Sequence, residues 1–248
     1  MSNAILITGC SHGLGRALAE LFSKENCKVY AIGRDSGLTN RLAKHSKNII
    51  PVVADITKEI GKAAIVDAVE KEDSISIIHN AAIANPSLIN SLSETQFKEH
   101  FETNFFSPFL LNQRLLKLFK KNSRALHISS LAADLALPGL MHYCTSKAAL
   151  ERMTHCFNAE FNSKEIYFAN LRPGMIDTEM QKKLRNSNEV DLPDRNFYVT
   201  AKKENKLLLP ETVAKFVVWV MLRTENLEFS KTLWNINDTS HHVNWLTS

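Results

Sequence analysis

The sequence predicts an α/β fold, a doubly wound sheet of about seven parallel strands with helices on both faces. Short apolar runs rich in Ile, Val, Leu and Ala alternate with segments of helical periodicity from one end of the chain to the other. Continuous apolar runs of this kind are typical of strands buried on both faces. Repeated strand–helix alternation favours parallel pairing, because each helix returns the chain to the same edge of the sheet. No break in composition marks a linker, so we expect residues 1–248 to form a single domain.

Each element follows from a local pattern. The expected strands are the apolar runs Ala4–Thr8, Lys28–Ile32, Ile49–Ala54, Ile75–His79, Ala125–Ser129, Ile166–Leu171 and Thr232–Ile236. The expected helices are the periodic segments Gly13–Asn26, Leu38–Lys44, Lys58–Lys71, Ser93–Lys121, Met141–Asn162 and Pro210–Thr224. Residues 175–206 are rich in polar and charged side chains and have little periodicity. This segment is predicted to be a long excursion from the sheet, and such segments are usually functional.

Apolar residues inside the 175–206 segment suggest a lid. Met175, Met180 and Leu184 recur at near-helical spacing, and Ile176 and Leu192 add further apolar surface. This pattern predicts a short amphipathic helix that closes its apolar side over a substrate. The alternative is an ordinary surface loop.

Composition and charge exclude several classes of protein. The 30 basic and 26 acidic residues are spread along the chain and give a net charge of +4, which favours neither a nucleic acid nor a membrane surface as partner. The longest apolar segment, around Phe216–Leu222, is shorter than the ~20 residues that span a bilayer, and no signal-peptide pattern is present. The cysteines and histidines lack metal-site spacing. We expect a cytoplasmic protein with reduced thiols and no metal, nucleic acid or membrane partner.

Three of the eight glycines fall within the segment T-G-C-S-H-G-L-G (Thr8–Gly15), between the first expected strand and the first expected helix. Glycines at such a turn let backbone N–H groups approach a pyrophosphate at the positive end of the helix. The spacing of Gly9, Gly13 and Gly15 does not fit G-x-G-x-x-G, and no Walker lysine is present. The segment predicts a nucleotide-binding loop of another type, and the alternative is a plain strand–helix corner.

Tyr143 and Lys147 form an i, i+4 pair within an expected helix, so an ammonium and a phenol lie on one helical face. A nearby cation favours the phenolate and lowers the pKa of a tyrosine, which would make Tyr143 a usable proton donor and acceptor. Such a pair alone is a weak signal. Ser130 strengthens the prediction of an active site, because it lies thirteen residues before Tyr143 at the carboxyl end of an expected strand. Active residues of open α/β sheets are found at that edge.

Taken together, these motifs resemble those of the short-chain dehydrogenase/reductases, in order and spacing, over about 235 residues. The family's T-G-x-x-x-G-x-G matches Thr8–Gly15, and its P-G turn after the sixth strand matches Pro173–Gly174. Its catalytic tetrad matches Asn104, Ser130, Tyr143 and Lys147. The resemblance implies a Rossmann-type fold, a nicotinamide cofactor, and dimers or tetramers built from the segments Phe105–Lys121 and Met141–Asn162.

Further family positions carry matching residues. The resemblance implies that Asp55 contacts adenine, that Asn80 belongs to the family's N-N-A-G motif, and that Thr178 meets the nicotinamide carboxamide. The motif reads H-N-A-A here, so His79 and Ala82 depart from the family pattern and put the local geometry in doubt. His79 is a minor candidate for a catalytic base.

The end of the second expected strand predicts the choice of cofactor. Gly33 stands where NAD-dependent members of the family carry an acid that binds the ribose 2′-hydroxyl, and Arg34 follows it. An arginine can bind a 2′-phosphate in bidentate fashion, so we predict NADP(H), with Asp35 as a signal for the NAD alternative. The predicted cofactor contacts are Gly9, Ser11, His12, Gly13, Leu14, Gly15, Arg34, Asp55, Ile56, Asn80, Ala81, Tyr143, Lys147, Pro173, Gly174, Ile176 and Thr178.

The resemblance also implies roles. Ser130 and Tyr143 bind the substrate carbonyl oxygen, Tyr143 donates the proton, Lys147 lowers the Tyr143 pKa and binds the nicotinamide ribose, and Asn104 holds a water. The segments Arg172–Gln181 and Lys202–Ala214 resemble the branch that contains sepiapterin and benzil reductases.

Together with the apolar residues around the expected site, this branch predicts an NADPH-dependent reductase of bulky apolar or aromatic (di)carbonyl compounds. A 3-oxoacyl or sugar-type reductase is the alternative within the family. A non-catalytic NADP-binding sensor is the alternative of another class.

Overall fold

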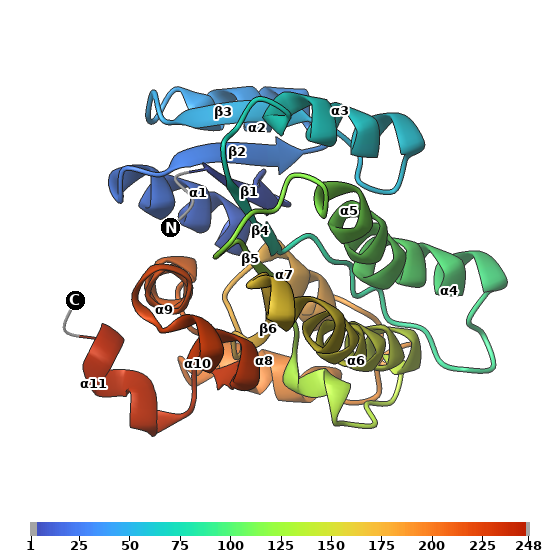
Figure 1. Ribbon diagram of the computed structural model, residues 1–248. Coiled ribbons are helices and arrows are strands. Elements are labelled where there is room, and N and C mark those ends of the chain that lie inside the picture. The colour runs from blue at the N-terminus through green and yellow to red at the C-terminus, as the bar shows by residue number, and fades with distance from the viewer. Residues whose placement is uncertain (1–3, 247–248) are drawn as a thin grey trace.

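The computed structural model describes residues 4–246 and contains a seven-stranded sheet in the order β3-β2-β1-β4-β5-β6-β7 (Figure 1). All six strand pairs are parallel, which confirms the predicted fold class. The order reverses between β1 and β4, and ligands of open α/β sheets bind at such a switch point, outside the carboxyl ends of the strands. The strands are β1 (Ala4–Thr8), β2 (Lys28–Gly33), β3 (Ile49–Val53), β4 (Ile75–His79), β5 (Arg124–Ile128), β6 (Tyr167–Arg172) and β7 (Leu233–Asn235).

Helices cover both faces of the sheet. Residues of α1 and α9 share one apolar cluster, which also contains the fully buried Trp234, whereas α3, α5 and α6 pack against the opposite face around Phe168. Every residue of β1, β4, β5 and β6 is buried, as expected for strands covered on both sides. The helices are α1 (Gly13–Lys24), α2 (Ser36–Ala43), α3 (Glu59–Val69), α4 (Glu94–Phe101), α5 (Ser107–Leu115), α6 (Met141–Phe161), α7 (Glu179–Arg185), α8 (Arg195–Lys203), α9 (Pro210–Arg223), α10 (Asn226–Lys231) and α11 (His242–Trp245).

The expected helix over Ser93–Lys121 is helical from Glu94 to Leu115, but it is not regularly α-helical and it ends earlier than predicted. A capping box between Ser93 and Gln96 begins α4, and a π-helical turn, Glu102–Phe106, separates α4 from α5. Within this turn the N–H of Ser107 donates to the carbonyl of Glu102, five residues earlier. The wider turn suits Pro108, because proline has no N–H to donate to the carbonyl four residues before it. Such π turns occur frequently at functional sites.

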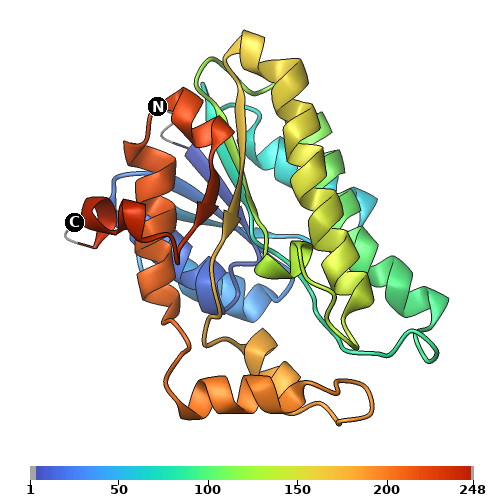
Figure 2. The ribbon, with the colours of Figure 1, turned by 90° about the horizontal axis from the view of Figure 1, so that it is seen from below.

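The 175–206 segment is more regular than its sequence indicates. It contains the expected short helix, α7, and a second helix, α8, that the sequence pattern does not predict. Both protrude together at one end of the sheet (Figure 2). The segment is anchored at its base, where Asp177 N donates to Leu208 O at 2.9 Å and Leu208 N donates to Met175 O at 2.8 Å. We call residues 175–206 the lid segment.

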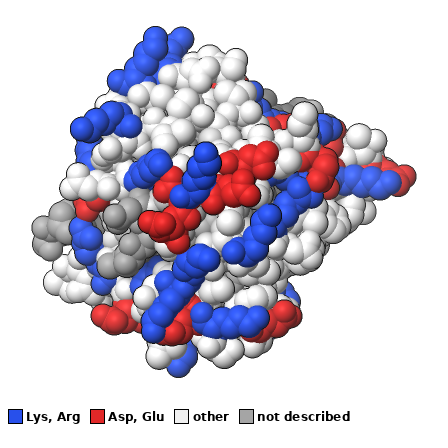
Figure 3. Space-filling model, turned by 45° about the horizontal axis from the view of Figure 1, so that its top comes forward, with Lys and Arg blue, Asp and Glu red and all other residues white. Residues whose placement is uncertain are grey.

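Charged side chains of both signs are mixed on the surface of the described residues (Figure 3). Lys and Arg side chains lie among Asp and Glu side chains on the face shown in Figure 3. No helix within residues 4–246 is long and apolar enough to cross a membrane. The same part of the chain holds no group of three His, Cys, Asp or Glu side chains that could bind a metal ion.

Candidate active site

A cavity of about 1110 Å³ lies where the strand order reverses. Its lining includes all seventeen residues that the sequence predicts as cofactor contacts, together with Ser130. They come from the loops that follow β1, β2, β3, β4 and β6, from the end of β5 and from the first turns of α6. The parallel fold therefore brings segments that are distant in sequence to one site.

The three glycines of the loop between β1 and α1 stand where a side chain would be crowded or strained. Gly9 and Gly13 have positive φ angles of 74° and 56°, which favour glycine. A Cβ atom on Gly15 would lie 2.2 Å from the carbonyl oxygen of Gly9, and one on Gly13 would lie 3.2 Å from the methyl group of Thr178. The loop thus forms a close backbone cradle at the N-terminus of α1, which fits the pyrophosphate of a dinucleotide.

Asn80 fixes this loop to the strand beside it. Its side-chain amide donates to the carbonyl of Thr8 at 2.9 Å, and the Thr8 hydroxyl accepts the backbone N–H groups of Asn80 and Ala81, each at 3.0 Å. The φ angle of Ala82 is not positive, so the alanine that replaces the family's glycine causes no backbone strain there. Ala82 lines the cavity, whereas His79, the other departure, does not.

His79 is unsuited to act as a base. It is 3% exposed, its Nε2 lies 2.8 Å from Asn112 Oδ1, and its ring stacks on that of His127. Burial lowers the pKa of His79 to about 4, which the hydrogen bond with Asn112 only partly opposes. His79 is therefore a neutral core residue, and the minor hypothesis of a catalytic base is wrong.

The end of β2 leaves Arg34 available to a ligand. Arg34 and Asp35 are both exposed and both line the cavity, but one carboxylate oxygen of Asp35 accepts the N–H of Leu38 at 2.9 Å and caps α2. Burial raises the pKa of Asp55, but hydrogen bonds from Thr57 and the charge of Arg34 outweigh that effect, so the pKa lies below its ordinary value. Arg34 and Asp55 therefore lie near each other across the expected adenosine end of the cavity.

Tyr143 and Lys147 lie on the same face of α6, beside the end of β5. The ammonium of Lys147 donates to the carbonyl of Ile128 at 2.7 Å and lies 5.8 Å from the centre of the Tyr143 ring. Burial raises the pKa of Tyr143 to about 12, and a hydrogen bond with Ser130 opposes this shift. Burial lowers the pKa of Lys147 to about 8, and the charge of Glu151 opposes that shift. Lys147 is not among the groups that shift the Tyr143 pKa, so the expectation that it lowers this pKa is not met.

Asn104 lies beside the cavity, on the π-helical turn between α4 and α5. It is 1% exposed, sits in the π-helical turn and does not line the cavity. Its Nδ2 donates to Ile83 O at 3.0 Å and to Ser146 Oγ at 3.1 Å, while its Oδ1 accepts the N–H of Ile83 at 2.9 Å. Asn104 therefore fixes the backbone after β4, which borders the cavity, to α6.

A buried ionic network beside the site is absent from the sequence predictions. Glu151 accepts hydrogen bonds from Arg172 Nε and Nη2, both at 2.8 Å, and from Ser129 Oγ at 2.7 Å. Arg172 also donates to Asp134 Oδ2 at 2.5 Å, in the loop that begins at Ser130. The network joins α6, β6 and the loop after β5. Its signal in the sequence is the repeat of polar residues at every fourth position, Tyr143, Lys147 and Glu151.

The far end of the cavity is largely apolar. The lid residues expected to face a substrate all line it, namely Met175, Ile176, Met180, Leu184 and Leu192. The loop after β5 supplies further apolar side chains, which are Leu131, Leu135, Leu137 and Leu140. Phe197 and Tyr198 of α8 also line the cavity, and the sequence reasoning missed both because it did not predict α8. Asp177 does not line it and binds Lys202 at 2.6 Å, which ties the lid segment together.

A phosphate cradle and a tyrosine–lysine pair share one cavity at the switch point of a parallel sheet. This combination defines the class of the protein as a nicotinamide-dependent oxidoreductase acting on small molecules. The sequence profile of the short chain dehydrogenase family matches residues 3–189. The chain belongs to the short-chain dehydrogenase/reductase family.

Individual members of the family show which of its branches this chain resembles. The chain is 31% identical over 228 residues to a benzil reductase ((S)-benzoin forming) of Bacillus cereus, covering 86% of this chain and 91% of that protein. It is 29% identical over 182 residues to a 3-oxoacyl-(acyl-carrier-protein) reductase of Rickettsia prowazekii, covering 72% and 75%. The crystal structure of the KRED1-Pglu enzyme matches with a TM-score of 0.85 and 26% identity, covering 94% of this chain and 99% of that one. The resemblance to the benzil reductase branch is confirmed.

Proposed function

We propose that the protein is an NADPH-dependent carbonyl reductase that acts on a ketone group of a bulky apolar or aromatic dicarbonyl compound. The proposal is carried by one observation: Ser130, Tyr143 and Lys147 share a cavity with the apolar side chains of the lid segment and of the loop after β5. Apolar surroundings with a few convergent polar groups are typical of sites for small apolar ligands. The likeness to benzil reductase along most of both chains supports the aromatic dicarbonyl class.

In this mechanism the nicotinamide supplies the hydride when it is bound. Ser130 and Tyr143 donate hydrogen bonds to the substrate carbonyl oxygen, and Tyr143 then transfers its proton to that oxygen. A Tyr143 pKa of about 12 keeps the phenol protonated at neutral pH, as an acid for reduction must be. Lys147 binds the nicotinamide ribose hydroxyls and places a positive charge beside Tyr143, while Asn104 acts by positioning the backbone of Ile83.

We infer that NADP(H) is preferred over NAD(H). Gly33 leaves the end of β2 without an acid, and Arg34 lines the cavity beside it. Asp35, the one sequence feature that favours NAD, uses its carboxylate to cap α2. A guanidinium suits the 2′-phosphate, which an acid at the end of β2 would repel. The seventeen predicted contact residues are the proposed cofactor site.

We further propose that residues 1–248 act as one domain, with the lid segment closing over the substrate, and that the chain forms homodimers or homotetramers. Large aromatic side chains support self-association through the α4–α5 and α6 region. Phe97 and Phe106 are 36% and 45% exposed, and the ring centre of Phe101 lies 4.8 Å from that of Phe97 and 6.5 Å from that of Phe106. Contiguous exposed apolar surface of this kind commonly marks an interface between copies of a chain.

Oxidation of NADPH, followed by absorbance with a panel of diketones, pterins, 3-oxoacyl thioesters, steroids and sugars, tests the proposal. Reduction of an aromatic diketone such as benzil at one carbonyl is the expected result. The second candidate function is reduction of 3-oxoacyl thioesters, which the likeness to the Rickettsia reductase supports. Turnover of thioesters with inert diketones would replace the first candidate by the second, and binding of NADPH without turnover of any substrate would favour a sensor.

A further inference from the structure

Tyr198 lines the same cavity as Tyr143 and packs against the same apolar cluster. Tyr143 comes from α6 and Tyr198 from α8 of the lid segment, yet both line the cavity and both are half-buried. They pack against the same apolar cluster, which consists of Ala132, Leu140, Cys144, Leu184 and Leu192. The lid therefore brings a second phenol to the apolar region where Tyr143 meets its substrate.

The hydroxyl of Tyr198 makes no hydrogen bond to any of residues 4–246. Among the described residues it makes no hydrogen bond, whereas the backbone carbonyl of Tyr198 accepts one from Gln181 Nε2 at 3.3 Å. That bond ties α8 to α7 and fixes the position of the ring. The other amide atom of Gln181, Oε1, is buried without a partner. The substrate end of the lid thus offers polar atoms that the fold itself does not use.

The two phenols are close enough to influence each other. Burial raises the pKa of Tyr198 to about 12, and Tyr143 is the next largest contributor to that shift. At neutral pH Tyr198 is therefore a neutral hydrogen-bond donor. The Tyr198 hydroxyl is not among the fully buried polar atoms of the described residues, so it is accessible from the cavity, where a bound ligand can accept its hydrogen bond.

We propose that Tyr198 determines specificity by donating a hydrogen bond to the second oxygen of a vicinal dicarbonyl substrate, while Ser130 and Tyr143 hold the first. This inference rests on the proposed carbonyl reductase function. Two carbonyl groups on adjacent carbons require two donors close together in an apolar site, and Tyr143 and Tyr198 supply them from different elements. A monoketone leaves the Tyr198 hydroxyl unpaired, and sites built for a hydrogen bond discriminate strongly against analogues that lack the partner.

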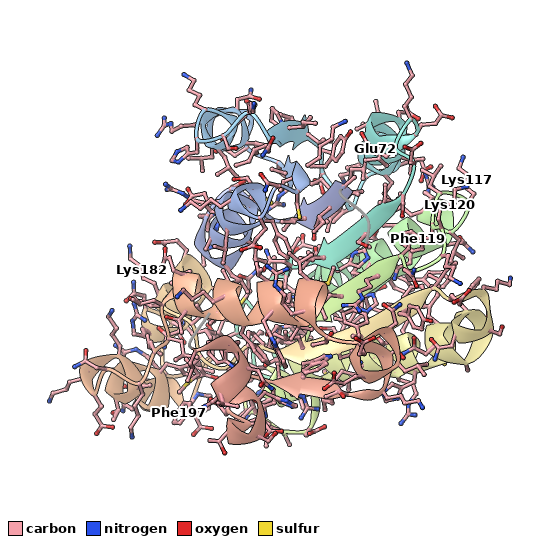
Figure 4. The ribbon with its side chains drawn as sticks, turned by 60° about the vertical axis from the view of Figure 1, so that its left-hand side comes forward. Glu72, Lys117, Phe119, Lys120, Lys182 and Phe197 are labelled. Carbon is pink, nitrogen blue, oxygen red and sulfur yellow. The ribbon has the colours of Figure 1, made fainter. Side chains whose placement is uncertain are left out.

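The test compares benzil with deoxybenzoin, which keeps both phenyl rings and one carbonyl but lacks the second oxygen. Steady-state kcat and KM for NADPH oxidation are measured for the wild type, Tyr198→Phe and a matched control, Tyr30→Phe. The Tyr30 hydroxyl bonds Glu72, which lies on the opposite side of the molecule from Phe197 of the lid (Figure 4). Since the Tyr198 hydroxyl has no partner in the protein, its removal breaks no internal hydrogen bond.

For Tyr198→Phe we expect kcat/KM for benzil to fall about 10- to 100-fold, as for other lost hydrogen bonds to a substrate, with less than about a twofold change for deoxybenzoin. For the Tyr30→Phe control we expect kcat/KM to stay unchanged for both benzil and deoxybenzoin. Equal losses for both substrates, or an unchanged benzil reaction, would overturn the role of Tyr198 while leaving the reductase function intact. A wild-type protein that reduces neither compound would overturn the proposed function, and the inference with it.

Discussion

Replacement of Glu151 by Gln tests whether the buried ionic network supports the site. Glu151 accepts three hydrogen bonds, two from Arg172 and one from Ser129, and the side chains of Glu151 and Arg172 are only 13% and 8% exposed. Gln preserves the shape but removes the charge and one acceptor oxygen. Breaking a buried ion pair costs about 3–5 kcal/mol of the free energy of unfolding. Because Gln keeps one acceptor and Arg172 keeps Asp134, we expect about 3 kcal/mol.

The same change alters the pH dependence of turnover. Burial lowers the pKa of Lys147 to about 8, and Glu151 is the charge that opposes this shift. The other titratable groups that interact with Lys147 are Tyr143 on α6 and His127 on β5, and His127 is a buried histidine with a strongly lowered pKa. Without Glu151 the Lys147 pKa falls further, so Lys147 loses its proton at lower pH. The alkaline limb of the kcat profile therefore moves to lower pH.

Urea unfolding and a pH profile of kcat measure both effects. The matched control is Glu160→Gln, an exposed position near the end of the same helix, for which we expect a change within about 0.5 kcal/mol and an unshifted profile. An unfolding free energy and an alkaline limb equal to those of the wild type in Glu151→Gln would refute the reasoning. Lower stability with an unshifted alkaline limb would leave Glu151 a purely structural role.

Three other predictions concern the site directly. Tyr143→Phe removes the proton donor and should lower kcat at least ~10²-fold while NADPH still binds, as measured by fluorescence; near wild-type turnover would contradict the assignment. Arg34→Ala should raise the Kd for NADPH about tenfold or more and leave NADH nearly unchanged, whereas equal losses would mean that Arg34 does not contact the 2′-phosphate. NADPH should protect the lid segment against limited proteolysis within residues 180–205. A cleavage rate that is the same with and without NADPH would count against lid closure.

Several features of the fold were predictable because they depend on local patterns. The apolar runs identify all seven strands, with limits within one or two residues of those observed, because a strand buried on both faces needs an uninterrupted apolar sequence. The glycines of Thr8–Gly15 identify the cradle, because no other residue fits beside the carbonyl of Gly9. Both patterns lie within short segments of the chain, so they can be recognised without knowing which distant residues they contact.

The limits of helices in the long helical segment and in the polar lid segment could not be predicted from the sequence. The π-helical turn at Glu102–Phe106 inserts one extra residue into a continuous run of helical backbone, so the sequence on both sides of it still has helical periodicity. Helix α8 has only nine residues, of which Ala201 alone is buried, and it lies within a segment rich in polar and charged side chains, so its apolar side was not recognised. It is stabilised by contacts such as those of Tyr198 with the apolar cluster of the lid.

The sequence by itself determined the fold class, the family and the residues that meet at the cavity, because those residues follow strand ends that a parallel sheet brings to one edge. Only the tertiary structure decided their physical state. Burial sets the pKa values of Tyr143 and His79, Asn104 bonds Ile83 rather than facing the cavity, and Glu151 joins Arg172 across three elements. Burial and long-range pairing depend on residues far apart in the chain, so no local pattern contains them.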